Sequence, residues 1–213
     1  IFRQIRNGMS SGVTEFSGGI IIFFFNQAIL RFISEDALVS YTIISYVNTI
    51  VVMSMTGIAQ GSQPLISYYF GKGEPKKYRK LLKYGILSAA VFSVVVTAGC
   101  YAGASGIVGI FLDGENPALS VYSIKVFRIF ILSFLLAGYN VVIGGYFASI
   151  EKAGFATFIS LTRSLIALVG CMMLLIAVLG GEGIWWSPLM AEAVCLVFSL
   201  LMLKRSFAKQ RKN

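Results

Sequence analysis

The sequence predicts an all-α membrane protein, a bundle of six transmembrane helices. Six apolar runs fill most of the chain, short polar breaks separate them, and 57% of the residues are hydrophobic while 13% are charged. A bilayer core of about 30 Å needs roughly 20 apolar residues of helix, and runs of this length are too long for barrel strands. The expected spans are residues 9–33, 37–70, 81–103, 119–150, 155–179 and 184–203.

The boundaries of these spans carry helix signals. The second and fourth spans are longer than one bilayer thickness, so they must tilt, bend or project beyond it. Gly71 and Gly73 end the second helix, and Pro75 starts the next one. Trp185 and Trp186 stand at the start of the sixth span, where we expect them to form part of an interfacial aromatic belt.

Most of the positive charge lies in alternate breaks of the chain. The opposite breaks carry acidic residues, and Arg31 is the one basic residue beside them. Because Lys and Arg stay on the cytoplasmic side, this pattern predicts that both chain ends are cytoplasmic. It also accounts for the net charge of +9 and argues against a nucleic-acid partner, since the charges are spread over several loops. The basic residues of these alternate breaks are Arg3, Arg6, Lys72, Lys76, Lys77, Arg79, Lys80, Lys83, Lys152, Lys204, Arg205, Lys209, Arg211 and Lys212.

Several kinds of chemistry are excluded or lack support. The chain has no histidine, which excludes a His-based catalytic triad or zinc site. It has no paired Asp or Ser–Lys arrangement at one depth, so we expect neither an enzyme nor a bound cofactor. Cys100, Cys171 and Cys195 lie inside spans without paired spacing, as small packing residues do.

The second span contains polar residues around a proline. Gln60 and Pro64 share one helix face, and Gln63 and Ser67 form a neighbouring face. Pro64 removes a backbone donor and should bend the helix, which is tolerated where neighbours or a cavity satisfy the freed carbonyl. Two interpretations stay open: a tightly packed bent helix, or a polar bend that faces a substrate cavity.

Three sequence blocks resemble one transporter family. They read GIAQGSQPLISYYFGKGEPKKYRK from Gly57, GYNVVIGGYFASIEKAGFATFISLTRSLI from Gly138, and GGEGIWWSPLMAE from Gly180. In this order and spacing they are similar to the carboxyl-terminal lobe of the multidrug and toxic compound extrusion (MATE) transporters, in the bacterial multidrug branch. The resemblance covers nearly the whole chain.

The resemblance implies a fold, a function and a partner. It implies twelve helices in two six-helix lobes, and an antiporter of the bacterial cytoplasmic membrane that couples proton or sodium entry to the export of bulky organic cations. Residues 1–8 would then be a cytoplasmic interlobe linker, 9–203 the six-helix lobe and 204–213 a cytoplasmic basic tail. The amino-terminal six-helix lobe would be the missing partner, beside the lipid bilayer.

Polar residues of five spans lie at a similar depth. Counted at about 1.5 Å of rise per residue from the nearest charged flank, they lie roughly 13–18 Å inside: Glu15, Gln60, Gln63, Asn140, Arg163 and Glu192. A charge at the bilayer centre costs at least about 2.5–3.5 kcal/mol, so Arg163 needs a partner. Glu192 is nearest in depth, and we expect a structural Arg163–Glu192 pair; Glu15 is the alternative partner.

Some of these residues are candidates for coupling and substrate binding. An unpaired carboxyl in a dehydrated cavity has a raised pKa and can carry a proton, which suggests a coupling role for Glu15. MATE transporters often carry a functional acid in the first helix of this lobe, near this position. Some also carry an acid in the fourth helix, where this chain has neutral Asn140. The expected ion-coupling or substrate cavity comprises Glu15, Gln60, Gln63, Pro64 and Asn140, with no metal site.

Two other functions remain as alternatives. A lipid-linked oligosaccharide flippase of the same superfamily would need several basic residues in its cavity, and Arg163 alone is thin support. A membrane scaffold without transport would not need polar residues at a shared depth.

The charge pattern yields a topology prediction. In a chain whose natural cysteines are replaced, single cysteines at Ser34 and Glu182 should react with a membrane-impermeant thiol reagent added outside the cell. Cysteines at Lys76 and Lys209 should react only after the membrane is opened. If the cysteine introduced at Lys76 were labelled from outside, the orientation would be the reverse of the predicted one.

Overall fold

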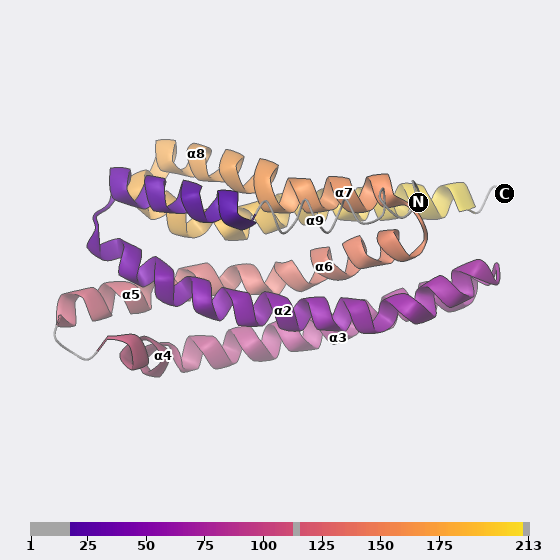
Figure 1. The fold of residues 1–213 in the computed structure, drawn as a ribbon, viewed down its shortest axis with the longest axis horizontal. Coiled ribbons are helices and arrows are strands. Elements are labelled where there is room, and N and C mark those ends of the chain that lie inside the picture. Colours follow the sequence, from indigo (N-terminus) through magenta and orange to yellow (C-terminus); the bar gives the residue numbers. More distant parts are fainter. Residues whose placement is uncertain (1–17, 113–115, 211–213) are drawn as a thin grey trace.

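The protein is an antiparallel bundle of long helices in a computed structural model that describes residues 18–112 and 116–210 (Figure 1). These residues contain no β-strand, and the predicted all-α membrane fold is confirmed. The helices are Gly18–Phe32, α2 (Asp36–Gly71), α3 (Pro75–Ala102), α4 (Ala104–Phe111), α5 (Pro117–Phe130), α6 (Phe134–Ser149), α7 (Ala153–Leu161), α8 (Ala167–Leu179) and α9 (Gly183–Gln210).

The described helices run lengthwise along the bundle (Figure 1). Four stretches are long and apolar enough to cross a membrane: Asp36–Gly71, Pro75–Ala102, Pro117–Ser149 and Ala153–Ala208. The last contains two passes, because the chain reverses at Gly180, whose φ of 62° and ψ of −146° suit glycine alone. At Gly183 a side chain would overlap the Leu175 carbonyl, so this tight hairpin requires glycine twice. The helix Gly18–Phe32 is also apolar but shorter than these stretches, and the part of the first predicted span before Gly18 lies outside the described residues.

Several helices extend beyond the apolar runs that predicted them. Helix α3 begins at Pro75, well before residue 81, and α9 continues to Gln210, past residue 203. The basic residues in these extensions are good helix formers, so the end of an apolar run marks the membrane and not the end of the helix. Helix α4 occupies a stretch that the sequence suggested was a break, and α2 continues without interruption through Pro64.

Two passes change helix type along their length. A short 3₁₀ turn, Ile131–Ser133, joins α5 to α6, and a π turn, Thr162–Ile166, joins α7 to α8. Asn116 caps α5 by accepting a hydrogen bond from the Leu119 amide at 3.1 Å, with Pro117 in the first helical position. The fourth and fifth passes therefore each consist of two helical segments.

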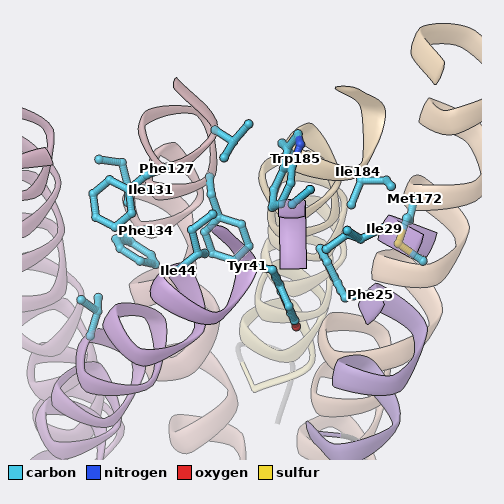
Figure 2. Close-up of a cluster of buried hydrophobic side chains, with 14 of the residues drawn as sticks. Phe25, Ile29, Tyr41, Ile44, Phe127, Ile131, Phe134, Met172, Ile184 and Trp185 are labelled. Atoms are coloured by element: carbon cyan, nitrogen blue, oxygen red, sulfur yellow. The ribbon is translucent and has the colours of Figure 1, made fainter. Parts of the chain in front are cut away.

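One apolar cluster fills the end of the bundle where α4, α5 and the α8–α9 hairpin lie (Figures 1 and 2). Trp185 lies inside it with 0% exposure, and its indole N–H donates to the Tyr122 hydroxyl at 3.0 Å. The expectation that Trp185 belongs to an interfacial belt is therefore wrong, because the glycine hairpin folds this side chain between helices. Phe25 and Tyr41 stack beside it with ring centroids 4.9 Å apart.

A second apolar cluster fills the other end of the bundle. Helix α6 lies at its centre, and the side chains of Val142, Tyr146 and Phe147 are each no more than 2% exposed. Around α6 lie α2, α3, α7 and α9, which each pack against it. Gly138 lets α6 approach α3 closely, since a Cβ there would stand 2.8 Å from Ser93 Oγ and 3.3 Å from Ala89 Cβ.

We predict that Gly138→Leu destabilises the bundle by about 1–3 kcal/mol, because a side chain there forces α3 and α6 apart. Gly99→Leu is the matched control, since Gly99 lies on the exposed face of α3 with no atom within 4 Å of a Cβ. The measurement is the thermal unfolding midpoint of both variants in detergent. Equal midpoints would show that the α3–α6 contact is less close than the structure indicates.

Candidate functional site

A polar layer lies inside the bundle, near the boundary between the two apolar clusters. We define the polar layer as Asn140, Arg163, Glu192 and Ser199, which lie on α6, the π turn and α9. On α6, Ala137 belongs to the first cluster, while Val142 belongs to the second. Asn140 therefore lies between the two clusters, whereas Ser199 lies within the second, whose members Cys195 and Leu203 flank it on α9.

Glu192 is the centre of the polar layer. Its Oε1 accepts a hydrogen bond from Arg163 Nε at 2.7 Å, and the two side chains are 11% and 19% exposed. The sequence suggested this pair on depth alone, and the structure brings the two side chains together. Because each charge neutralises the other, neither remains as an isolated ion in the interior.

Asn140 supplies the second contact to Glu192. Its Nδ2 donates to Glu192 Oε2 at 2.7 Å and to the Glu192 backbone carbonyl at 3.0 Å. Its Oδ1 accepts from Ser199 Oγ at 3.0 Å, which fixes the orientation of the amide. Asn140 is 1% exposed, so it belongs to the interior of the bundle and does not line an open face.

The π turn positions Arg163 within this layer. The Ala167 amide bonds to the Thr162 carbonyl across the turn, which is one residue wider than an α-helical turn. Such turns are frequent at functional sites and change the direction in which side chains project. Within the described residues, the buried Thr162 hydroxyl has no hydrogen-bond partner. Nothing in the sequence marked this turn.

Ser199 is a member of the polar layer that sequence reasoning missed. It lies two turns after Glu192 on α9, so the two residues share a helix face. Its side chain is 0% exposed. The spacing from Glu192 could have indicated that it faces the same interior, but a lone serine in an apolar helix carries no signal by itself.

The other predicted site residues lie apart from the polar layer. Gln60 and Pro64 are exposed on the surface of α2. Gln63 is half-buried and packs on α6: its Nε2 lies 2.9 Å from the point where a Cβ at Gly145 would stand. Glu15 lies outside the described residues. The structure thus separates the residues expected around one cavity into an interior group and an exposed group on α2.

The chemistry available at the polar layer is limited. Glu192 has both carboxylate oxygens engaged, one by a guanidinium and one by an amide. In the described part of the chain, no group of three or more His, Cys, Asp or Glu residues could hold a metal ion. Each Glu192 oxygen thus accepts a hydrogen bond from inside the bundle, and the ion pair joins the π turn to α9.

We predict that Arg163→Ala lowers the free energy of unfolding by about 3–5 kcal/mol, because it leaves the Glu192 charge inside the bundle without its counter-ion. Adding Glu192→Gln should restore part of this loss, since the carboxamide keeps the size of the side chain and removes its charge. Thermal unfolding of both single variants and the double variant measures the coupling. Strictly additive losses would contradict a stabilising pair.

The chain is similar to curated drug exporters over part of their length. It is 27% identical over 148 residues to "Multidrug export protein MepA" of Staphylococcus haemolyticus (strain JCSC1435). It is 25% identical over 151 residues to the protein of that name from Staphylococcus aureus (strain NCTC 8325 / PS 47). Each match covers 69% of this chain and 32% of the relative, so the chain spans about a third of the length of these relatives.

Solved structures with the same fold are also transporters. "Crystal structure of MATE in complex with MaL6" gives a TM-score of 0.91 at 18% identity, over 99% of this chain and 48% of the other. The outward-facing conformation of a multidrug resistance MATE family transporter gives a TM-score of 0.90 at 18% identity. This match covers 98% of this chain and 47% of the transporter. At this identity the likeness shows the fold. The MatE family model matches residues 11–173, most of the chain, and the chain therefore belongs to the MATE family of multidrug transporters.

Proposed function

We propose that this chain is the carboxyl-terminal half of a cation-coupled multidrug antiporter. In this proposal it exports bulky organic cations by alternating access, in which one six-helix lobe rocks against the other around a site near the membrane midplane. The antiporter would lie in the bacterial cytoplasmic membrane. The basic end of the bundle, with the α2–α3 turn, the α6–α7 turn and the last turns of α9, would face the cytoplasm.

The observation that carries this proposal is a stripe of small and polar residues that α2 exposes on the bundle surface, in which Gln60 supplies the polar side chain. Gly57, Gln60, Gly61 and Pro64 are all exposed, although they lie within a helix long enough to cross the membrane. Polar side chains in membrane spans almost always face protein or a water-filled cavity. An amino-terminal lobe facing α2 would cover this stripe and enclose a cavity between the two lobes.

The coupling role is proposed for Glu15. Of the acidic residues in the sequence, Glu15 and Glu192 alone lie deep within predicted spans. Glu192 is neutralised by Arg163 and hydrogen-bonded by Asn140, which leaves Glu15 as the carboxyl able to exchange a proton or sodium ion. Thr14 and Ser17 beside it in sequence add polar groups to the same stretch.

The exposed stripe on α2 fits a drug exporter better than a lipid-linked oligosaccharide flippase. Pyrophosphate-bearing substrates need several cations in the cavity, whereas the stripe offers neutral Gln60 and the backbone near Pro64. Arg163 is engaged inside the bundle by Glu192. A stripe without basic residues does not repel large organic cations.

We predict that Glu15→Gln, made in this chain together with the proposed amino-terminal lobe, keeps expression but reduces the efflux of a fluorescent organic cation to background. The amide cannot release a proton or bind sodium strongly, so the remaining efflux should no longer depend on the ion gradient. Efflux from cells with and without an ionophore measures this dependence.

Glu35→Gln is the matched control, because it removes one carboxylate from an exposed turn outside the spans. This variant should retain gradient-dependent efflux. Normal gradient-dependent efflux by Glu15→Gln would contradict the coupling role and leave Glu15 as a structural residue.

A further inference from the structure

A basic pocket lies at the end of the bundle where α6 turns into α7 and meets the last turns of α9. The pocket has a volume of about 410 Å³, and residues 151–155 line it together with Arg205 and Ser206 of α9. This end also holds the α2–α3 turn (Figure 1), so it is the lysine-rich end that the charge pattern places at the cytoplasmic membrane surface. The pocket is separate from both the polar layer and the exposed stripe on α2.

The backbone of the α6–α7 turn is fixed by paired hydrogen bonds. The Lys152 amide donates to the Phe147 carbonyl at 3.0 Å, and the Glu151 amide donates to the Ala148 carbonyl at 3.2 Å. This is the Schellman pattern, in which glycine usually occupies the left-handed position. Here Glu151 occupies it with φ of 59°, an uncommon conformation for a residue with a side chain.

The pocket offers several donors to an anion. Lys152 and Arg205 contribute two cations against the one carboxylate of Glu151, so the lining is net positive. Ala153 and Gly154 are the first residues of α7, and the geometry of a helix leaves their amides without acceptors inside the helix. Together these groups suit a phosphate.

Ser206 brings a buried hydroxyl to the pocket. The residue is 2% exposed, lines the pocket and accepts a hydrogen bond from Lys152 Nζ at 2.6 Å. A hydroxyl that accepts a hydrogen bond can still donate its own proton, so Ser206 can donate to an anionic oxygen that also contacts Lys152.

An apolar surface continues from the pocket toward the middle of the bundle. Phe155 lines the pocket, and Phe158 lies about one turn further along α7. The Phe158 ring meets the Phe198 ring of α9 edge to face, with centroids 6.1 Å apart, and the two residues are 40% and 43% exposed. A ligand with a phosphate in the pocket could therefore lay hydrocarbon along α7 and α9.

We propose that this pocket binds the headgroup phosphate of an anionic glycerophospholipid, with an acyl chain along the Phe158–Phe198 surface. Basic pockets between transmembrane helices on the cytoplasmic side suit such headgroups. Arg205, Lys152 and the Ser206 hydroxyl hold the phosphate, and Glu151 weakens binding by repulsion.

The test uses the full chain in neutral detergent, with phosphatidylglycerol added at increasing concentration. Phosphatidylglycerol should raise the thermal unfolding midpoint, and phosphatidylcholine should do so much less. Arg205→Gln should weaken the apparent affinity for phosphatidylglycerol about fivefold, since that is the order of contribution of one cation to an anionic lipid. Lys204→Gln is the matched control: it removes the same charge from the neighbouring exposed position, outside the pocket.

Glu151→Asn provides a change in the opposite direction. Asparagine tolerates the left-handed conformation, so this variant removes the negative charge and keeps the turn. It should strengthen phosphatidylglycerol binding several-fold. Equal weakening by Arg205→Gln and Lys204→Gln, or equal stabilisation by phosphatidylcholine, would overturn the proposal. If inorganic phosphate alone raised the midpoint as far as phosphatidylglycerol, the lipid assignment would be wrong and the ligand would be a soluble anion.

Discussion

The neutralisation of Glu192 inside the bundle is the constraint on which the helix arrangement depends. A carboxylate between two apolar clusters requires a counter-ion and hydrogen bonds, and these come from Arg163 at 2.7 Å and from Asn140. Satisfying one side chain in this way ties the π turn and α6 to α9. Ser199 completes the network through the Asn140 amide, so each of these groups has a partner within the polar layer.

Polarity in this chain serves two separate purposes. The polar layer lies in the interior and its members are hydrogen-bonded to one another, so it holds helices in place. The stripe of Gly57, Gln60, Gly61 and Pro64 is exposed on α2. Under the proposed mechanism, a lobe with such an interior would move as one body, and its exposed face would meet the other lobe and the substrate. The basic pocket at the α6–α7 turn is a third region, at the lysine-rich end of the bundle.

The fold could be predicted from the sequence more fully than the site. Long apolar runs and glycine-rich breaks are local signals, and they predicted six spans. Helices α3 and α9 extend beyond their predicted spans where basic residues continue the helix. The Arg163–Glu192 contact could be anticipated because a buried charge has few possible partners. Asn140 was expected with the cavity residues, yet it is 1% exposed and hydrogen-bonded to Glu192. Depth along a helix can be counted from the sequence, but the direction of a side chain around the axis depends on the neighbouring helices.

The sequence by itself determined that the chain lies in lipid, that it is helical, and at what depth along the spans the polar residues lie. Each of these follows from the hydrophobicity and charge of a single segment. Only the tertiary structure decided which polar residues meet. The π turn re-aims Arg163, the hairpin at Gly180 buries Trp185, and the crossing of α6 with α9 brings Asn140 onto Glu192. These outcomes depend on packing between segments far apart in the chain, which no local pattern of residues encodes.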